Sequence, residues 1–150
     1  MRRALIRTKM KEIEESVRLV EAHLPDTFEK FSNMGLVKDG MYKRIEFAIE
    51  NVFDICAIIN ADLELGIPSN EKSIVDNLIK NGILSEEIRV KLKAMKGFRN
   101  ILAHRYGEID DKLAFSILKE LLGDFYVFLE RIEAFLSEEG LNERQRKAIE

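Results

Sequence analysis

The chain has 150 residues, 46% apolar and 34% charged, so it is long enough to bury a core as one domain. Its net charge of −3 argues against a strongly basic nucleic-acid scaffold but leaves room for one small basic site. Two prolines and eight glycines are few for a turn-rich β fold, and no apolar stretch approaches the roughly 20 residues that cross a bilayer. Cys56 stands alone in an apolar run, which is typical of a reduced, buried thiol in a cytoplasmic protein.

Hydrophobic periodicity predicts two long helices in the first half of the chain. Residues 3–24 repeat apolar side chains in alternating steps of four and three, and Pro25 ends the pattern. A second helix is expected over residues 41–65. The segment 25–40 between them predicts a connection punctuated by Gly35 and Gly40, in which Phe28 and Phe31 could pack a short helix.

Capping signals define the next two helices. Gly66-Ile67-Pro68 breaks the chain, Ser69 or Asn70 is expected to cap a short helix, and Asn81-Gly82 to end it. Ser85 is expected to cap a longer helix that ends near residues 104–106, before Gly107.

The last helix is expected over residues 111–138 and to end before Gly140. It carries two adjacent apolar stripes, more than one core face requires, which suggests an oligomer interface. We therefore predict an all-α, up-and-down bundle of four main helices plus one or two short ones. A single domain would cover residues 1–139, and residues 140–150 would form a polar tail.

One stretch, residues 97–110, breaks the hydrophobic pattern. The stripe Ile88, Leu92 and Met95 resumes at Leu102, and Arg99 stands where a core residue is due. Burying an unpaired guanidinium costs several kcal/mol, so Arg99 should have an anion, a partner or a groove.

His104 follows Arg99 by five residues, and on an ideal helix the two would point roughly 140° apart. If the helix loosens before His104, or if a symmetric dimer brings two copies together, both side chains could act on one RNA phosphate. His104 could then move the proton of the 2′-hydroxyl or of the leaving 5′-oxygen, while Arg99 stabilises the developing charge. Spacing alone favours a helix cap and an ion pair instead. Two histidines and one cysteine show no zinc spacing, so we expect no metal.

The segment Arg99-Asn100-Ile101-Leu102-Ala103-His104, with Tyr106 two residues later, resembles the motif of the HEPN superfamily and of its HepT-like toxins. The similarity extends through the helix containing Asp54 and the Gly66-Ile67-Pro68 break.

This resemblance implies a homodimeric helical bundle with metal-independent, cofactor-free RNase activity, and a minimal nucleotidyltransferase antitoxin as partner. By position, Arg99 and His104 would be catalytic, Asn100 would support them, and Tyr106 would accept AMP from the antitoxin. Asp54 matches an acidic position of the family and would orient Arg99. A nucleotide on Tyr106 would place negative charge in the groove for RNA phosphate, which would explain inhibition.

Two other interpretations remain open. In the first, the chain is a non-catalytic subunit that binds nucleotide or substrate for a nucleotidyltransferase partner, and Arg99 binds a phosphate. In the second, which is purely structural, Arg99 forms an ion pair with Asp54 or Glu50. The polar face containing Glu50 and Asp54 could also be simply solvated, or Asp54 could point at a cation in the interior.

Overall fold

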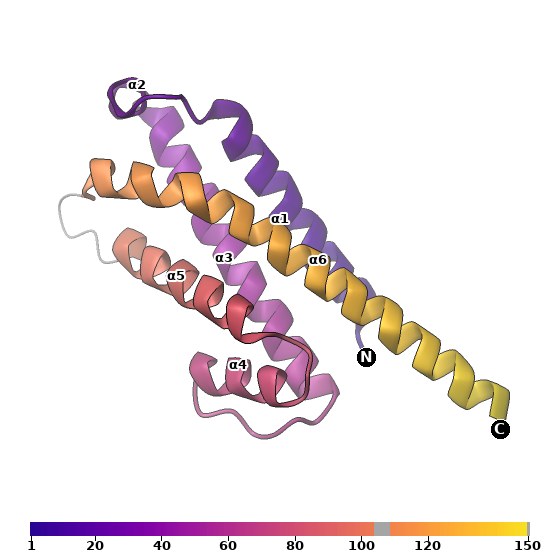
Figure 1. The fold of residues 1–150 in the computed structure, drawn as a ribbon. Coiled ribbons are helices and arrows are strands. Elements are labelled where there is room, and N and C mark those ends of the chain that lie inside the picture. The colour runs from indigo at the N-terminus through magenta and orange to yellow at the C-terminus, as the bar shows by residue number, and fades with distance from the viewer. Residues whose placement is uncertain (104–108, 150) are drawn as a thin grey trace.

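The computed structural model describes residues 1–103 and 109–149. The helices of this part are α1 (Arg3–His23), α2 (Phe28–Ser32), α3 (Leu36–Asp62), α4 (Glu71–Lys80), α5 (Glu86–Ala103) and α6 (Asp111–Ile149). The long helices α1, α3, α5 and α6 form an up-and-down bundle, and the short helices α2 and α4 lie at its opposite ends (Figure 1). The predicted all-α bundle of four main helices is confirmed.

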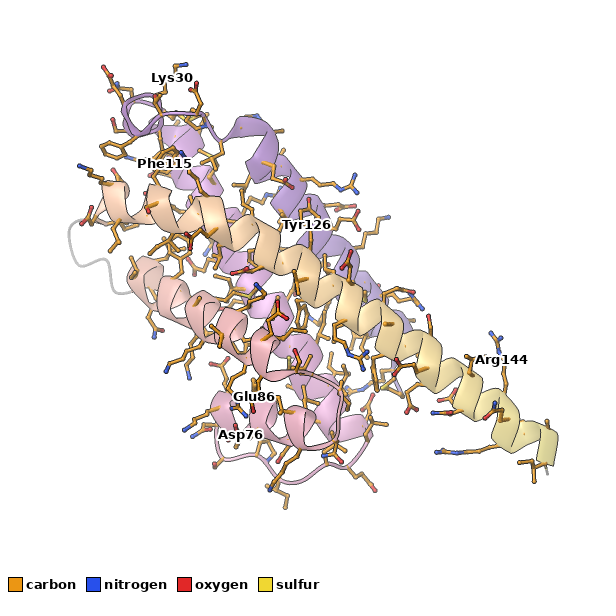
Figure 2. The ribbon with its side chains drawn as sticks, viewed as in Figure 1. Lys30, Asp76, Glu86, Phe115, Tyr126 and Arg144 are labelled. Carbon is orange, nitrogen blue, oxygen red and sulfur yellow. The ribbon has the colours of Figure 1, made fainter. Side chains whose placement is uncertain are left out.

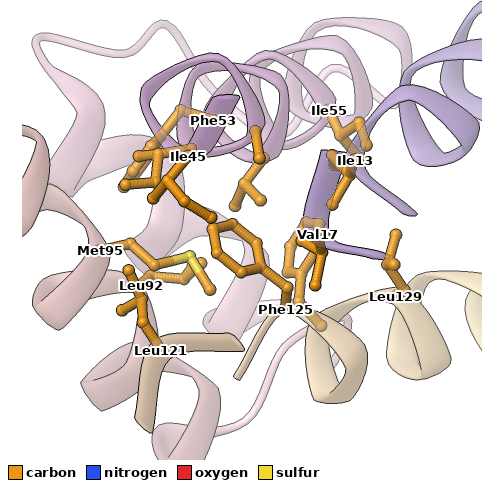
Figure 3. Packing of buried hydrophobic residues seen from close by; sticks show 14 of the residues in the cluster. Ile13, Val17, Ile45, Phe53, Ile55, Leu92, Met95, Leu121, Phe125 and Leu129 are labelled. Atoms are coloured by element: carbon orange, nitrogen blue, oxygen red, sulfur yellow. The ribbon is translucent and has the colours of Figure 1, made fainter. Parts of the chain in front are cut away.

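The core lies between α3 and the helices around it. α3 contacts α1, α4 and α5, and α6 packs on α1, α2 and α5. Phe125 of α6 is fully buried and lies among side chains such as Val17, Ile45 and Met95 from the other three long helices (Figure 3). Burying an aromatic side chain of this size contributes about 1.5–3 kcal/mol, so such residues hold the four helices together. Cys56 is also fully buried, and burial raises the pKa of its thiol to about 12.

Both apolar stripes of α6 are used within the chain itself. The stripe that suggested an oligomer interface is buried at Leu118, Leu122, Leu129 and Leu136. A helix that packs on three neighbours needs a wider apolar face than a helix that packs on one. The second stripe is therefore no argument for a dimer, and the homodimer stays a prediction.

The start of α3 and the end of α6 differ from the prediction because each helix continues through a glycine. α3 begins at Leu36, five residues early, so Gly40 lies inside the helix, and Gly35 (φ +55°) precedes it. α6 continues through Gly140 to Ile149, so residues 140–149 are helical and the predicted end at 138 is wrong. Arg3 of α1 donates a hydrogen bond to the Leu136 carbonyl oxygen at 2.8 Å and contacts Glu143 at 3.6 Å, which holds α6 across this glycine.

The capping predictions are confirmed. Asn70 accepts a hydrogen bond from the Ser73 backbone N–H at 2.8 Å, and the Ser73 hydroxyl accepts one from the Asn70 N–H, which forms a capping box. Gly82 has φ +71° after α4, and Ser85 caps α5 by accepting from the Ile88 N–H. Within the described residues, no helix combines the length and the apolar content that crossing a bilayer would require.

A pair of amide side chains, the buried Asn60 and the partly buried Asn77, fixes α4 against the end of α3. The Asn60 side chain donates to the Gly66 carbonyl oxygen at 2.9 Å and accepts from the Asn77 amide at 3.0 Å. Gly66 has φ +136°, and a Cβ there would lie 3.3 Å from the Asn77 amide nitrogen. The loop between α3 and α4 is therefore tied to both helices at one point.

Replacing Asn60 by alanine should destabilise the fold by about 1–3 kcal/mol, because it removes both of these part-buried hydrogen bonds at a position that is only 2% exposed. Urea unfolding would measure the change. Asn142→Ala, at an exposed position of α6, is the matched control and should shift stability by less than about 0.5 kcal/mol. Equal effects of the two variants would contradict the role given to Asn60.

Candidate functional site

Arg99 lies near the end of α5 and forms a bidentate ion pair with Glu71 of α4. Its Nη2 lies 2.5 Å from Glu71 Oε1 and its Nη1 lies 3.0 Å from Oε2. The guanidinium also lies 5.0 Å from the ring centroid of Phe53 on α3. Only 17% of the arginine side chain is exposed. Three helices therefore fix one cation, by the paired hydrogen bonds that suit arginine and carboxylate and by a cation–π contact.

The apolar stripe of α5 is not interrupted as the sequence suggested. Phe98 is buried and continues the stripe between Met95 and Leu102, so Arg99 lies at its edge. The expectation that a largely buried arginine needs a partner is confirmed, but the partner is neither Asp54 nor Glu50. Glu71 precedes Arg99 by 28 residues, beyond the range of helical side-chain pairs. Its place in the first turn of a capped helix was the only sequence signal for it.

The ion pair shifts both partners in the directions expected for opposite charges. The hydrogen bond to Glu71 raises the pKa of Arg99, against an opposing effect of burial, and the charges of Glu71 and Glu50 add to the rise. The hydrogen bond from Arg99 lowers the pKa of Glu71, again against burial, with smaller contributions from the charges of Arg99 and Lys96. Both side chains are therefore charged at neutral pH.

Asp54 is placed differently from the expectation. Its carboxylate contacts Lys9 Nζ of α1 at 3.1 Å, and 55% of its side chain is exposed. It therefore points at solvent and α1 and not at a cation in the interior. The neighbouring Phe53, and not Asp54, is the residue of this turn that contacts Arg99.

A pocket of about 490 Å³ opens beside the ion pair, between α4 and α5. Its apolar surface comes from Phe53, Val75 and Leu92. Gly97 and the exposed Asn100 line it from α5. The supporting role expected for Asn100 stays a prediction, and its position beside Arg99 and on the pocket is compatible with that role.

The pocket is surrounded by more positive than negative side chains. Four cations line it, Lys72, Arg89, Lys93 and Lys96, and Glu71 is the one carboxylate among the lining residues that the structure describes. Arg89 is held by Asp76, in the middle of α4, and by Glu86, at the start of α5; the two acidic residues are labelled close together in Figure 2. Lys96 lies 3.8 Å from Glu71. For Lys72 and Lys93, no ion pair occurs with another described residue, so these two charges are available to an anion.

His104 and Tyr106, predicted to act in catalysis and in regulation, lie outside the described residues, so their roles stay predictions. Arg99 lies about one turn before the end of α5 at Ala103, and α6 begins at Asp111. The start of α6 is held to α3 because the Asp111 carboxylate accepts hydrogen bonds from the Tyr42 hydroxyl at 2.6 Å and from Lys38 Nζ at 2.8 Å. Among residues 1–103 and 109–149, no three histidine, cysteine or acidic side chains gather as a metal-binding group.

Comparison with known families decides the relationship. Residues 13–132 match the model of the family described as Ribonuclease HepT-like. The chain belongs to this family.

Two named relatives support the assignment of this HepT-like chain. A candidate RNase of Archaeoglobus fulgidus is 34% identical over 97 residues, which cover 65% of this chain and 73% of the relative. The mRNA nuclease HepT of Shewanella oneidensis is 29% identical over 98 residues, covering 65% and 74% of the two chains.

Solved structures extend the similarity to the fold. The tri-AMPylated HEPN toxin of Shewanella oneidensis, determined in complex with its MNT antitoxin, superimposes with a TM-score of 0.77 at 25% identity. The match covers 87% of this HepT-like chain and 97% of the toxin. A cytosolic protein of unknown function from Bacillus subtilis has the same fold, with a TM-score of 0.78 at 17% identity and 93% coverage of both chains.

Glu71→Gln should lower the free energy of unfolding at neutral pH by about 1–2 kcal/mol, because the amide replaces a charged hydrogen bond to Arg99. The folded-state pKa of Glu71 lies below its ordinary value of 4.5, so the stabilisation is present above that value and is lost as the pH falls through the lowered pKa. The stability difference between wild type and variant should therefore be full at pH 7 and shrink as the pH falls below about 4.5.

Urea unfolding across this pH range would measure the difference, with Glu120→Gln, an exposed carboxylate of α6, as control. A difference that stays constant on acidification would rule out Glu71 as the titrating partner.

Proposed function

We propose that this protein is a metal-independent endoribonuclease toxin whose cleavage site contains Arg99 and His104. The family membership carries the proposal, because relatives of this chain are named as RNases and as an mRNA nuclease. The position of Arg99 supports it. A rigidly held cation at the edge of a pocket with surplus positive charge suits a phosphodiester substrate.

Arg99 stabilises the charge that develops on the scissile phosphate. Its terminal nitrogens contact Glu71, but a guanidinium carries five N–H donors. A phosphate therefore binds at the remaining donors or replaces Glu71 as the anionic partner. Glu71 keeps the guanidinium oriented in the free protein, which lowers the entropic cost of placing it against the substrate.

His104 transfers the proton, and Asn100 supports the site from the same helix. An imidazole that titrates near neutrality can take a proton from the 2′-hydroxyl or give one to the leaving 5′-oxygen. Attack by the 2′-hydroxyl on phosphorus breaks the bond to the 5′-oxygen. The products are a 2′,3′-cyclic phosphate and a 5′-hydroxyl end.

The proposed partners are a second copy of the chain and a nucleotidyltransferase antitoxin. The HEPN toxin of Shewanella oneidensis was determined AMPylated and bound to its MNT antitoxin, which supports the same kind of control here. Tyr106 is the proposed acceptor of AMP. The added phosphate would repel the RNA backbone from the cations near Arg99.

Purified protein should cleave single-stranded RNA in the presence of EDTA, and Arg99→Ala and His104→Ala should each lower the rate by about 10²-fold or more. Gel analysis of end-labelled RNA would measure the rates and the ends of the products. Equal cleavage by all three proteins would indicate a contaminating nuclease, and 3′-hydroxyl products would contradict attack by the 2′-hydroxyl.

A non-catalytic role as the binding subunit of a nucleotidyltransferase is the second candidate. The observation that favours it is the Arg99–Glu71 pair, which occupies both terminal nitrogens of the proposed catalytic arginine. In that case Arg99→Ala and His104→Ala would change the affinity for the partner or for nucleotide, and neither variant would alter RNA cleavage.

Co-expression with a cognate nucleotidyltransferase should add AMP to Tyr106 and abolish RNA cleavage, because the modification brings negative charge to the phosphate site. Mass spectrometry of peptides would locate the modification, and Tyr106→Phe should remain unmodified and active. AMP found only on Tyr42 or Tyr126 would contradict this regulatory role.

A further inference from the structure

Gly97 is a glycine that neither the backbone nor the packing of this chain requires. It lies inside α5, where glycine destabilises a helix relative to alanine, and it is not among the residues with positive φ. A Cβ built at this position would meet nothing within 4 Å beyond its chain neighbours and the backbone of its own helix. The space above Gly97 is the pocket between α4 and α5.

One face of α5 presents this pocket with several functional groups. Lys93, Gly97 and Asn100 lie four and three residues apart and so share a helix face. Arg99 follows on the adjoining face, with its guanidinium fixed by Glu71, itself a lining residue of the pocket. The pocket is thus continuous with the proposed cleavage site.

The lining of the pocket combines two kinds of surface. Phe53, Val75 and Leu92 give an apolar floor, and Lys72 and Lys93 place positive charge at its exposed rim. Its volume of about 490 Å³ lies within the range of roughly 300–1,000 Å³ that small-ligand pockets occupy. A ligand that carries both a flat aromatic nucleobase and a phosphate group would match the apolar floor and the positive rim.

We propose that this pocket holds one nucleotide of a single-stranded RNA substrate, next to the phosphate that Arg99 engages. The base lies on the apolar floor above Gly97, and the phosphate of the same nucleotide contacts Lys72 and Lys93. The absence of a side chain at position 97 provides the room for the base. This assignment rests on the proposed ribonuclease function and adds a substrate subsite to it.

Charge favours RNA over a protein occupant. The chain as a whole is acidic, yet the described residues that line the pocket include four cations and one carboxylate. Two of these cations have no described ion-pair partner, so a polyanion gains contacts without breaking existing ones.

The direct test measures binding of a fluorescent 2′-O-methyl oligoribonucleotide to the full-length protein by anisotropy. The methylated ribose blocks the nucleophile, so the wild-type protein can be used without cleavage. Gly97→Leu should weaken binding at least tenfold by filling the pocket, and Gly97→Ala should weaken it by a smaller factor. Both variants should unfold at the wild-type Tm or above it, because each residue favours a helix more than glycine does.

Gly123→Ala is the matched control, since Gly123 is exposed within α6 and a Cβ there also meets nothing within 4 Å. It should change the Tm in the same direction as Gly97→Ala and leave RNA binding unchanged. Lys72→Gln combined with Lys93→Gln should lower the slope of log K against log salt by about 0.7, because the two lysines contact the same single-strand phosphate.

The outcomes separate this subsite from the proposed function. If wild-type protein cleaves RNA but Gly97→Leu binds and cleaves as well as wild type does, the subsite is wrong and the ribonuclease stands. If wild-type protein neither binds nor cleaves RNA, the proposed function itself fails. A Gly97→Leu variant that changes oligomeric state, or loses only the antitoxin complex, would assign the space to a protein partner and overturn the proposal.

Discussion

The ion pair between Arg99 and Glu71 is the interaction on which the candidate site depends. It joins α5 to α4, and the contact of Arg99 with Phe53 adds α3 to the same point. Because the guanidinium is mostly buried, loss of Glu71 would leave a desolvated charge and would reposition the one described residue of the proposed catalytic pair. The geometry of the motif is therefore set by a carboxylate outside the motif.

Glu71 is itself held by interactions that have no direct role in chemistry. The capping box of Asn70 and Ser73 fixes the first turn of α4, and the amides of Asn60 and Asn77 fix α4 against the end of α3. At its other end, α3 holds the start of α6 through Tyr42 and Asp111. The end of α5 and the start of α6 are thus both held to α3, through Phe53 and Tyr42. The long central helix α3 therefore sets the positions of the helices that flank the site.

An acidic protein can contain a site for a polyanion if its negative charges are neutralised elsewhere. Asp54 pairs with Lys9, Asp62 with Arg2, and Asp111 with Lys38, all away from the pocket between α4 and α5. The surplus of positive charge is left where Lys72 and Lys93 border the pocket. Net charge therefore excludes an extended basic surface but says little about a single phosphate-binding position.

The sequence by itself determined the helical class, most helix positions, the caps at Asn70 and Ser85, and the family motif, because periodicity and capping are local signals. It misplaced the start of α3 and the end of α6, since Gly40 and Gly140 destabilise these helices by less than the packing around them stabilises them. Only the tertiary structure identified Glu71 as the partner of Arg99, turned Asp54 towards Lys9, and opened the pocket at Gly97. Those features arise where separate helices meet, and the relative placement of helices is fixed by packing of the whole core.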